Sequence, residues 1–354
     1  MKKIKKSYIF GMIALVLLTA AYMNRQTLAM AGFDWFLQGE VEDRLADTYK
    51  PVDRDVKTVP VPVSAALEED PFSVLLIGVD QRDNEIGRSD TLIYTVVRPS
   101  DGSMLLVSLP RDLYVELAGK GRADKINHAF AFGGAGLTMD TVEQLLDAPV
   151  DHYASINFEG FREAINAIGG IALPIEEDIV NDDPGHEYFV IEGGQDLYNG
   201  TDALNFVRYR EDAGGDVSRT ERHQQFLHAM IEKAKGMKQW SQIPELIDIM
   251  GDNFSTDMTP GKLIDLAQRL IQADNRMMYS HTLLGYGHRL VQGGAWYYFA
   301  DEEDLASVQT MIRSWLDADT TQASLRLPPK YEELELQQKE VQSLAMDETA
   351  NETE

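Results

Sequence analysis

"FSVLLIGV", residues 72–79, is a nearly continuous apolar run with the length of a buried β-strand. Two further strand-like segments follow it, TLIYTVVR at 91–98 and SMLLVSL at 103–109, and the PSDG between them is a strong turn signal. Short connections favour antiparallel pairing of consecutive strands. The three segments therefore predict the first half of a central sheet.

Helical and strand-like patterns alternate after these strands. A helix is predicted from about Thr138, then a strand over DHYASIN (151–157), then a helix capped by Asn157 and closed by Gly169-Gly170. Later segments are the helix GKLIDLAQRLIQ (261–272), the strand-like RMMYSHTLLGY (276–286) and the helix EEDLASVQTMIRSWLD (302–317). Mixed elements in this order predict an α/β sandwich and not a repeat protein.

The N-terminal residues predict a membrane anchor. Lysine-rich MKKIKK and Ser7 precede YIFGMIALVLLTAAYM, an apolar run over residues 8–23 that flanking residues extend toward the roughly 20 a bilayer requires. We expect residues 1–7 to be cytoplasmic, residues 8–28 to form a signal-anchor transmembrane helix, and the rest to lie outside the cytoplasm. A cleaved signal peptide is the alternative, because LAMAG at 28–32 resembles a cleavage site.

The remainder divides into three parts. Residues 29–70 are interrupted by Pro51, Pro60 and Pro62 and are expected to form a membrane-proximal stalk. Residues 71–320 contain the strand and helix patterns and are predicted to be one extracytoplasmic domain. The acidic residues 321–354 are expected to be a disordered tail.

Charge and cysteine content exclude several classes of function. The formal net charge of −26 argues against binding nucleic acid through general electrostatics. The chain has no cysteine, so neither disulfides nor thiolate metal sites hold the fold. Local clusters of basic residues are informative against this acidic background.

The antiparallel arrangement predicts a charged rim at one end of the sheet. Asp80 ends the first strand, Arg88 and Asp90 start the second, and Arg111 follows the third. Two carboxylates without a histidine or cysteine companion favour a hard cation, Mg²⁺ or Mn²⁺, and a hard cation beside arginines points to phosphate. The alternative is that each aspartate is a turn residue that bonds to its own backbone.

A second basic cluster lies in RYREDAGGDVSRTERHQ, residues 208–224, which contains Arg208, Arg210, Arg219 and Arg222. The S-x-x-E spacing of Ser218 and its partner three residues later predicts a helix that begins at Arg219. Arginines in a first helical turn oppose the macrodipole, which an anion bound there would explain. A surface paired with nearby acidic residues is the alternative. Lys125 and His128, in KINHAF, are weaker candidates for the same anion site.

The ordered motifs of the chain resemble those of the LytR-CpsA-Psr family. They are LLIGVDQR (75–82), GRSDTLIY (87–94), SLPRDLYV (108–115), KINHAFAFGG (125–134), INFEGFREAINAIGGI (156–171), GGQDLYNGTDALNFVRYR (193–210) and SRTERHQQ (218–225). The resemblance covers about residues 72–318. It implies an α/β/α sandwich with a mixed central sheet and a groove for a polyprenyl chain.

The resemblance also implies an activity. A membrane-anchored phosphotransferase would use Mg²⁺ to move a glycopolymer, such as wall teichoic acid, from an undecaprenyl-diphosphate carrier to the C6 hydroxyl of N-acetylmuramic acid in peptidoglycan. Its place would be the cell membrane of a Gram-positive-type envelope, as a single-pass type II protein. A hydrolase of the same lipid diphosphate and a non-enzymatic envelope scaffold or regulator are the alternatives.

Site residues follow from the matching motifs. Asp80 and Asp90 would hold the metal. Catalytic roles fall to Asp80, Arg88, Arg111 and Arg210, and diphosphate binding to Arg88, Arg111, Lys125, Arg208, Arg210, Arg219 and Arg222. The helices that begin at Phe158 and Arg219 are candidates to line the lipid groove. One position departs from the family, because this chain reads Arg222-His223-Gln224 where the family usually has Arg-Gln-Gln.

Overall fold

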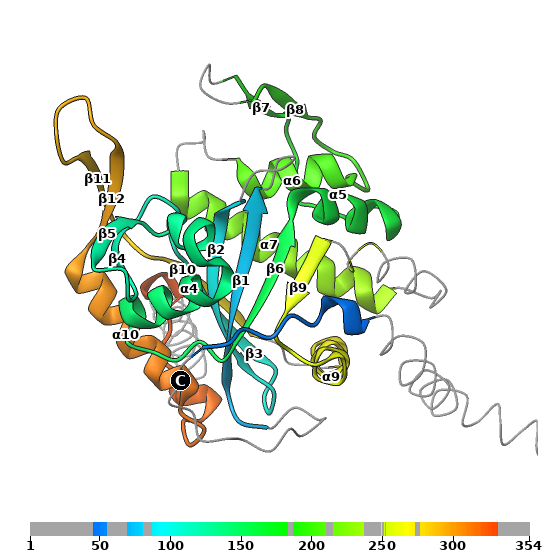
Figure 1. The fold of residues 1–354 in the computed structure, drawn as a ribbon. Helices are drawn as coiled ribbons and strands as arrows, with labels where there is room; N and C mark the ends of the chain where they lie inside the picture. Colours follow the sequence, from blue (N-terminus) through cyan, green and yellow to red (C-terminus); the bar gives the residue numbers. More distant parts are fainter. Residues whose placement is uncertain are drawn as a thin grey trace, which may run out of the picture.

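A six-stranded sheet with the order β10-β3-β2-β1-β6-β9 forms the centre of the computed structural model (Figure 1). The structure describes residues 45–54, 69–80, 87–182, 187–209, 215–236, 249, 251, 253–272 and 277–331. The strands are β1 (Phe72–Asp80), β2 (Arg88–Arg98), β3 (Ser103–Ser108), β6 (His152–Asn157), β9 (Phe254–Thr256) and β10 (Met278–Thr282).

Strand directions confirm the predicted mixed sheet. β1 and β3 both pair antiparallel with β2, as the short connections predicted. β6 runs parallel to β1, and β10 runs parallel to β3. The carboxyl ends of β1, β3, β6 and β10 therefore meet at one rim, together with the start of β2.

Helices cover both faces of the sheet (Figure 1). α4 (His128–Leu146) and α10 (Glu302–Leu316) pack on one face, and α7 (Gly215–Gly236) and α9 (Pro260–Gln272) on the other. α5 (Phe158–Ala167) and α6 (Gly200–Arg208) form a smaller apolar cluster with α7.

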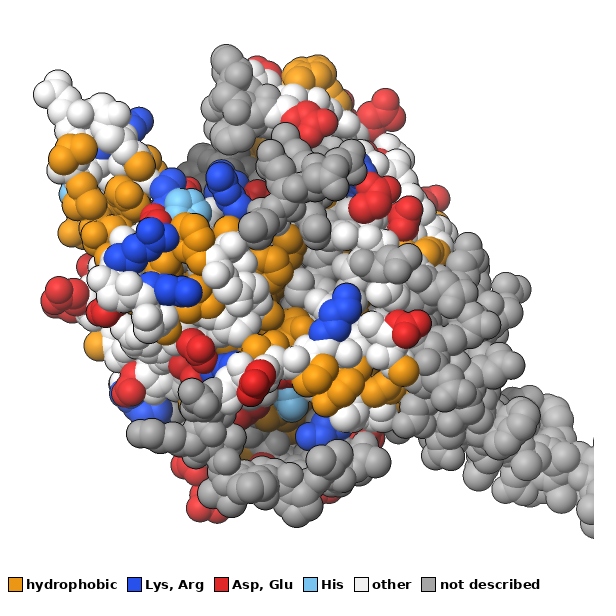
Figure 2. All heavy atoms as spheres, viewed as in Figure 1, with side chains coloured by type: hydrophobic (Ala, Val, Ile, Leu, Met, Phe, Trp, Pro, Cys, Tyr) orange, Lys and Arg blue, Asp and Glu red, His pale blue; other side chains and the backbone are white. Residues whose placement is uncertain are grey.

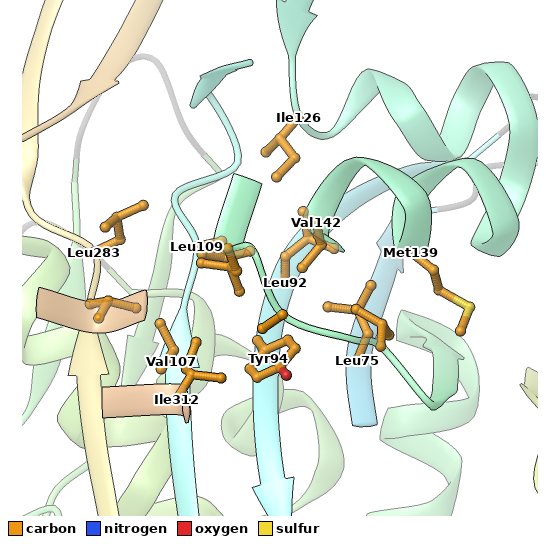
Figure 3. Close-up of a cluster of buried hydrophobic side chains, with 14 of the residues drawn as sticks. Leu75, Leu92, Tyr94, Val107, Leu109, Ile126, Met139, Val142, Leu283 and Ile312 are labelled. Atoms are coloured by element: carbon orange, nitrogen blue, oxygen red, sulfur yellow. The ribbon is translucent and has the colours of Figure 1, made fainter. Parts of the chain in front are cut away.

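The apolar run of β1 is explained by these two layers. Leu75 and Ile77 are buried against the α4 and α10 side, in the cluster that Figure 3 shows in part, whereas Val74 belongs to the cluster on the α7 and α9 side. A strand that is covered on both faces needs apolar residues at successive positions. The continuous pattern in FSVLLIGV thus follows from burial on both faces.

Two predicted helix boundaries have different outcomes. Asn157 caps α5, because its Oδ1 accepts a hydrogen bond from the Gly160 N–H at 2.8 Å. The helix expected from Thr138 begins instead at His128, and it contains a kink at Gly133-Gly134. Gly134 adopts a φ of 62°, which interrupts the helix. The hydrophobic periodicity is broken there, so it did not predict the turns before the kink.

Three two-stranded hairpins lie outside the central sheet. They are β4 (Tyr114–Leu117) with β5 (Arg122–Lys125), β7 (Ile179–Asn181) with β8 (Phe189–Ile191), and β11 (Gly285–Arg289) with β12 (Trp296–Ala300). The segment 276–286, expected to be one strand, is divided between β10 and β11. Short 3-10 helices occur at Ala46–Thr48 and Gln322–Ser324.

Parts of the expected stalk and tail pack on the domain. The Arg54 guanidinium bonds to Asp140 at 2.7 Å and to Glu143 at 2.6 Å, both on α4. At the other end, Leu325 is buried, and the Arg326 carbonyl accepts a hydrogen bond from Trp315 Nε1 at 2.8 Å. Residues 45–54 and 321–331 are therefore ordered parts of the domain's surface, because apolar and ionic contacts hold them there.

The predicted N-terminal anchor cannot be placed. Residues 1–7 and 8–28 lie outside the described residues. Within the described ranges, no helix has the length and apolar character needed to cross a membrane.

Candidate functional site

Asp90 occupies a β-bulge at the predicted rim. The register between β1 and β2 passes from Gly78 opposite Thr91 to Val79 opposite Ser89, so Asp90 is the extra residue on β2. Bulges bend a strand locally and redirect a side chain. One step further, Asp80 and Arg88 face each other as the last pair of the ladder.

A row of alternating charges begins at Asp90. Its Oδ1 lies 3.0 Å from Arg111 Nη1, and Arg111 Nε lies 3.7 Å from Asp112 Oδ2. The other oxygen of Asp112 contacts Lys125 Nζ at 2.5 Å. The structure thus brings Asp90 and Arg111 together, as the antiparallel strands predicted, and it adds Lys125 to them. Asp112 is the carboxylate that links the two cations.

His128 and Asp124 form a second pair beside this row. His128 Nδ1 lies 2.9 Å from Asp124 Oδ1, and the Lys125 N–H donates to the same oxygen at 2.8 Å. Burial alone would raise the pKa of Asp124, but the hydrogen bonds from His128 and the Lys125 backbone prevail and hold that pKa below its usual value. Asp124 therefore fixes His128 and the β5 backbone next to Lys125.

Arg208 reaches the same rim through Phe158. Its Cζ lies 4.5 Å from the centroid of the Phe158 ring, a cation–π contact. Phe158 starts α5 directly after β6, and its ring is a close neighbour of Gly78 on β1. A Cβ added to Gly78 would lie 3.0 Å from Thr91 Cβ and 3.9 Å from the Phe158 ring, so glycine allows this close packing.

The helix of the second arginine cluster begins earlier than predicted. α7 starts at Gly215 and not at Arg219, so Ser218 lies inside the helix and is not its N-cap. Arg219 and Arg222 therefore lie beyond the first turn of α7, and their predicted place at the helix N-terminus is wrong.

Arg222 and His223 are buried between α7 and α6. Each is 7% exposed. Arg222 Nη1 donates to the Tyr209 carbonyl at 2.9 Å, and His223 Nε2 contacts the Val207 carbonyl at 3.0 Å. Burial lowers the pKa of Arg222. Because the last carbonyls of a helix lack intrahelical partners, these two side chains cap the C-terminal end of α6, next to Arg208.

The structure does not place two of the predicted diphosphate ligands. Arg210 lies outside the described residues, and the backbone of Arg219 is in α7 while its side chain is outside them. The two helices expected to line a lipid groove do meet, because the rings of Phe161 on α5 and Phe226 on α7 lie 5.0 Å apart. Leu227 and Ile231 of α7 extend the contact to the sheet.

Asn127 is a site residue that the sequence argument passed over. Its backbone N–H donates to the Arg111 carbonyl at 3.2 Å. Its side-chain Oδ1 is buried and has no hydrogen-bond partner within the described part of the chain. The signal was its place between Lys125 and His128 in KINHAF, and a free amide oxygen there can accept from a ligand or bind a cation.

The oxygen ligands fit a magnesium ion. Mg²⁺ in phosphoryl-transfer sites is commonly held by one or two carboxylates, with water and substrate phosphate completing its shell. Asp80 and Asp90 could supply such carboxylates. In the described ranges, no three histidine, cysteine, aspartate or glutamate side chains cluster as a metal site, so an all-protein cage is not formed there.

Comparison with known proteins identifies the family. The sequence model of the LytR_cpsA_psr family matches residues 36–314. The chain belongs to this family. The resemblance of the motifs is thereby confirmed, and in this LytR_cpsA_psr member GRSDT, SLPRD and KINHAF supply the charged row described above.

Named relatives agree with this membership. Polyisoprenyl-teichoic acid--peptidoglycan teichoic acid transferase TagU of Halalkalibacterium halodurans is 34% identical over 297 residues, which are 82% of this chain and 94% of the relative. The crystal structure of Bacillus subtilis TagU shares 33% identity and a TM-score of 0.55, over 71% of this chain and 99% of that one. A structure of TagT bound to LIIa-WTA shares 27% identity and a TM-score of 0.59, over 76% and 99% of the two chains.

Proposed function

We propose that this protein is a phosphotransferase that moves a cell-wall glycopolymer from a polyprenyl-diphosphate carrier to peptidoglycan. The donor we propose is undecaprenyl-diphosphate-linked wall teichoic acid, and the acceptor is the C6 hydroxyl of N-acetylmuramic acid. The transferase names of the relatives support the reaction class. The carrier, the polymer and the hydroxyl are proposed from the family resemblance.

The row from Asp90 to Lys125 is the observation that carries the proposal. A diphosphate needs several cations in fixed positions, and Arg111 and Lys125 are held at 3.0 and 2.5 Å from their carboxylate partners. Both side chains keep part of their surface exposed, so a ligand can contact them. Charge-assisted contacts of this kind stabilise a bound phosphate by roughly 1.5–3 kcal/mol each.

In the proposed reaction, the acceptor hydroxyl oxygen forms a bond to the phosphorus that carries the glycopolymer. The bond between that phosphorus and the bridging oxygen breaks, and polyprenyl monophosphate leaves with the bonding electrons. The hydroxyl proton leaves to a base or to solvent. Arg111, Lys125 and Arg208 would orient the diphosphate and neutralise the charge that develops on its oxygens.

Magnesium would supply further charge neutralisation when it is bound. Asp80 and Asp90 would hold it. Asn127 Oδ1 is buried beside Arg111. It would accept a hydrogen bond from a hydroxyl group of the lipid-linked substrate. Arg88, opposite Asp80 in the last pair of the ladder, would be a further contact for the diphosphate.

The protein's own membrane anchor would keep it near its donor. We propose that residues 8–28 span the cell membrane and that the domain works outside the cytoplasm. The lysines before the apolar run support this orientation.

Defined lipid-linked donors and peptidoglycan fragments test the function directly. The full-length chain should form a covalent polymer–peptidoglycan product in the presence of Mg²⁺ and release polyprenyl monophosphate in equal amount. Release of free polymer at the same rate with and without acceptor would assign hydrolysis instead. Absence of both products, with correctly folded protein and a relative as positive control, would favour a scaffold.

A further inference from the structure

The β11–β12 hairpin exposes large apolar side chains on both of its faces and in its turn. Tyr286 is 60% exposed, Leu290 51%, Val291 66% and Trp296 48%. Figure 1 shows the hairpin projecting from the domain, and Figure 2 shows hydrophobic side chains gathered over it. Single exposed apolar residues are ordinary, but a cluster of this kind on a projecting element marks an interaction surface.

The base of the hairpin is fixed to the domain. The rings of Tyr297 and Phe299 lie 5.0 and 5.3 Å from the ring of Tyr114 on β4. The Leu284 N–H donates to Asp304 Oδ2 at 2.8 Å, which ties the first strand to α10. The hairpin tip, residues 289–296, is therefore presented from a rigid base.

Two apolar side chains of the tip lie against glycines of the hairpin. A Cβ added to Gly287 would lie 2.2 Å from Trp296 Cζ2, so the indole lies against the glycine backbone. Val291 similarly covers Gly294, where an added Cβ would lie 2.6 Å from Val291 Cγ2. Trp296 and Val291 are thus each held against a glycine, and Leu290 is exposed next to Val291 in the turn.

Charge distinguishes this hairpin from the rest of the chain. Residues 282–300 contain His288 and Arg289 but no aspartate or glutamate, in a chain of net charge −26. The β7–β8 hairpin also exposes apolar residues, including Val190 at 41%, but residues 176–192 are rich in carboxylates. Of these two exposed hairpins, only β11–β12 is compatible with an anionic surface.

The hairpin also emerges at the rim of the candidate site. β10 runs parallel to β3, so the chain leaves β10 at the same end of the sheet where Arg111 follows β3. The Tyr298 N–H donates to the Asp112 carbonyl at 2.9 Å, and Lys125 Nζ lies 5.8 Å from the Tyr297 ring. A surface that receives the hairpin tip would therefore lie next to the charged row.

We propose that the β11–β12 hairpin inserts its tip into the surface of an anionic lipid bilayer. Leu290 and Val291 would enter the acyl boundary, Trp296 and Tyr286 would lie at the headgroup level where such rings concentrate, and Arg289 would contact lipid phosphate. This contact is additional to any anchor in residues 8–28. It would set the rim of the sheet at the level of lipid headgroups, and it does not depend on the transferase reaction.

A glycan strand is the competing occupant, since sugars also stack on flat aromatic rings. Glycan recognition adds hydrogen bonds from amide and carboxylate side chains around the ring. Gln292 is the single amide or carboxylate side chain in residues 282–300. The composition of the tip therefore favours lipid.

Site-specific fluorescence tests the insertion in the full-length chain. Because the chain has no cysteine, Val291→Cys can be labelled uniquely with an environment-sensitive nitrobenzoxadiazole dye. The labelled protein is reconstituted in phosphatidylglycerol/phosphatidylcholine nanodiscs with or without lipids that carry a doxyl quencher on the acyl chain. We expect the doxyl lipids to reduce the emission severalfold and to leave a Val190→Cys label on the β7–β8 hairpin unchanged.

A second variant makes the result specific to the apolar tip. Leu290→Asp in the Val291→Cys background changes an exposed side chain, so the fold should persist, and lipid quenching should fall to the level of the Val190→Cys control. Equal quenching at positions 190 and 291, or no quenching at position 291, would overturn the proposal. Protection of the label by isolated cell walls in place of lipid would overturn it too and would assign the tip to a glycan.

Discussion

His223 on α7 donates its Nε2–H to the carbonyl oxygen of Val207 near the end of α6, at 3.0 Å. The carbonyl can only accept, so Nε2 carries the proton. The resemblance to the family implies a glutamine at this position, and a glutamine amide can donate in the same way. The departure from the family thus keeps a hydrogen bond that caps α6 beside Arg208, and it gives no reason to expect direct contact with phosphate.

Substitutions of His223 should separate this capping role from a chemical role. His223→Gln should leave the free energy of unfolding nearly unchanged. His223→Leu leaves the Val207 carbonyl without this donor and should destabilise the protein by about 1–3 kcal/mol. Urea unfolding measures both variants. A loss of transfer in His223→Gln at unchanged stability would instead give the imidazole a role in the reaction.

Arg111 should matter far more for activity than for stability. Its pair with Asp90 is part-exposed, and such pairs contribute about 0–1 kcal/mol. Arg111→Gln should therefore unfold within about 1 kcal/mol of the unchanged protein. Loss of one charge-assisted contact to the diphosphate should lower transfer by roughly ten- to a hundredfold.

A distant pair provides the matched control. Arg313 and Asp147 form a surface pair at 3.4 Å, away from the rim. Arg313→Gln should change neither stability nor transfer appreciably. Equal activity of the Arg111→Gln and Arg313→Gln variants would remove Arg111 from the proposed site.

Chelation should stop transfer without unfolding the protein. Asp90 already has a cationic partner in Arg111. Removal of Mg²⁺ therefore does not leave the Asp90 carboxylate without a positive neighbour, and the fold should persist. We expect EDTA to abolish product formation, added Mg²⁺ to restore it, and the unfolding temperature without donor to change by only a few degrees. Asp80→Asn should raise the Mg²⁺ concentration that half-restores transfer. Full activity after exhaustive chelation would contradict the metal proposal.

The sequence predicted what periodicity and short connections determine. β1, β2 and β3 and their antiparallel order followed from their apolar runs, and with them the meeting of Asp90 and Arg111. The bulge at Asp90 could not be predicted, because it is a one-residue shift between two paired strands. The burial of Arg222 and His223 could not be predicted either. It depends on how α7 packs against the end of α6, which the local sequence pattern does not determine.

The start of α7 and the β11–β12 hairpin were missed for different reasons. A capping box at Ser218 is a local signal, and the helix continues past it in the N-terminal direction to Gly215. The hairpin lacks alternation, because its exposed tip carries apolar residues where polar ones are usual. That exception to the pattern is also the observation behind the lipid proposal.

Acid should weaken the contribution of Asp124 to the free energy of unfolding. Because its pKa is depressed in the folded protein, its stabilisation is present above the unfolded value of about 3.9 and is lost as the pH falls through the folded value. The unfolding free energy of the unchanged protein should exceed that of Asp124→Asn at pH 6. The difference should shrink as the pH is lowered below about 4. A difference that persists unchanged at pH 3 would show that the carboxylate charge is not its source.

Arg98 should be a major determinant of stability. It is 3% exposed and donates to three carbonyls in and after the last turn of α10, those of Trp315 at 2.8 Å, Asp317 at 3.0 Å and Thr320 at 2.6 Å. Its Nε also lies 3.0 Å from Asp101 Oδ2. Arg98→Met keeps the volume but leaves these acceptors without their donor, and we expect a cost of about 3–5 kcal/mol.

Lysine at position 98 provides the graded comparison. A single ammonium keeps the charge for Asp101 but cannot donate to all three carbonyls as the guanidinium does. The unfolding free energy of Arg98→Lys should therefore lie between those of the unchanged protein and Arg98→Met. Urea unfolding measures the three proteins, and an unchanged m-value would show that the folded state keeps its extent. Because Arg98 ties β2 to the end of α10 at the opposite rim from Asp90, transfer per folded molecule should stay the same. A variant Arg98→Met that unfolds within about 1 kcal/mol of the unchanged protein would contradict this account.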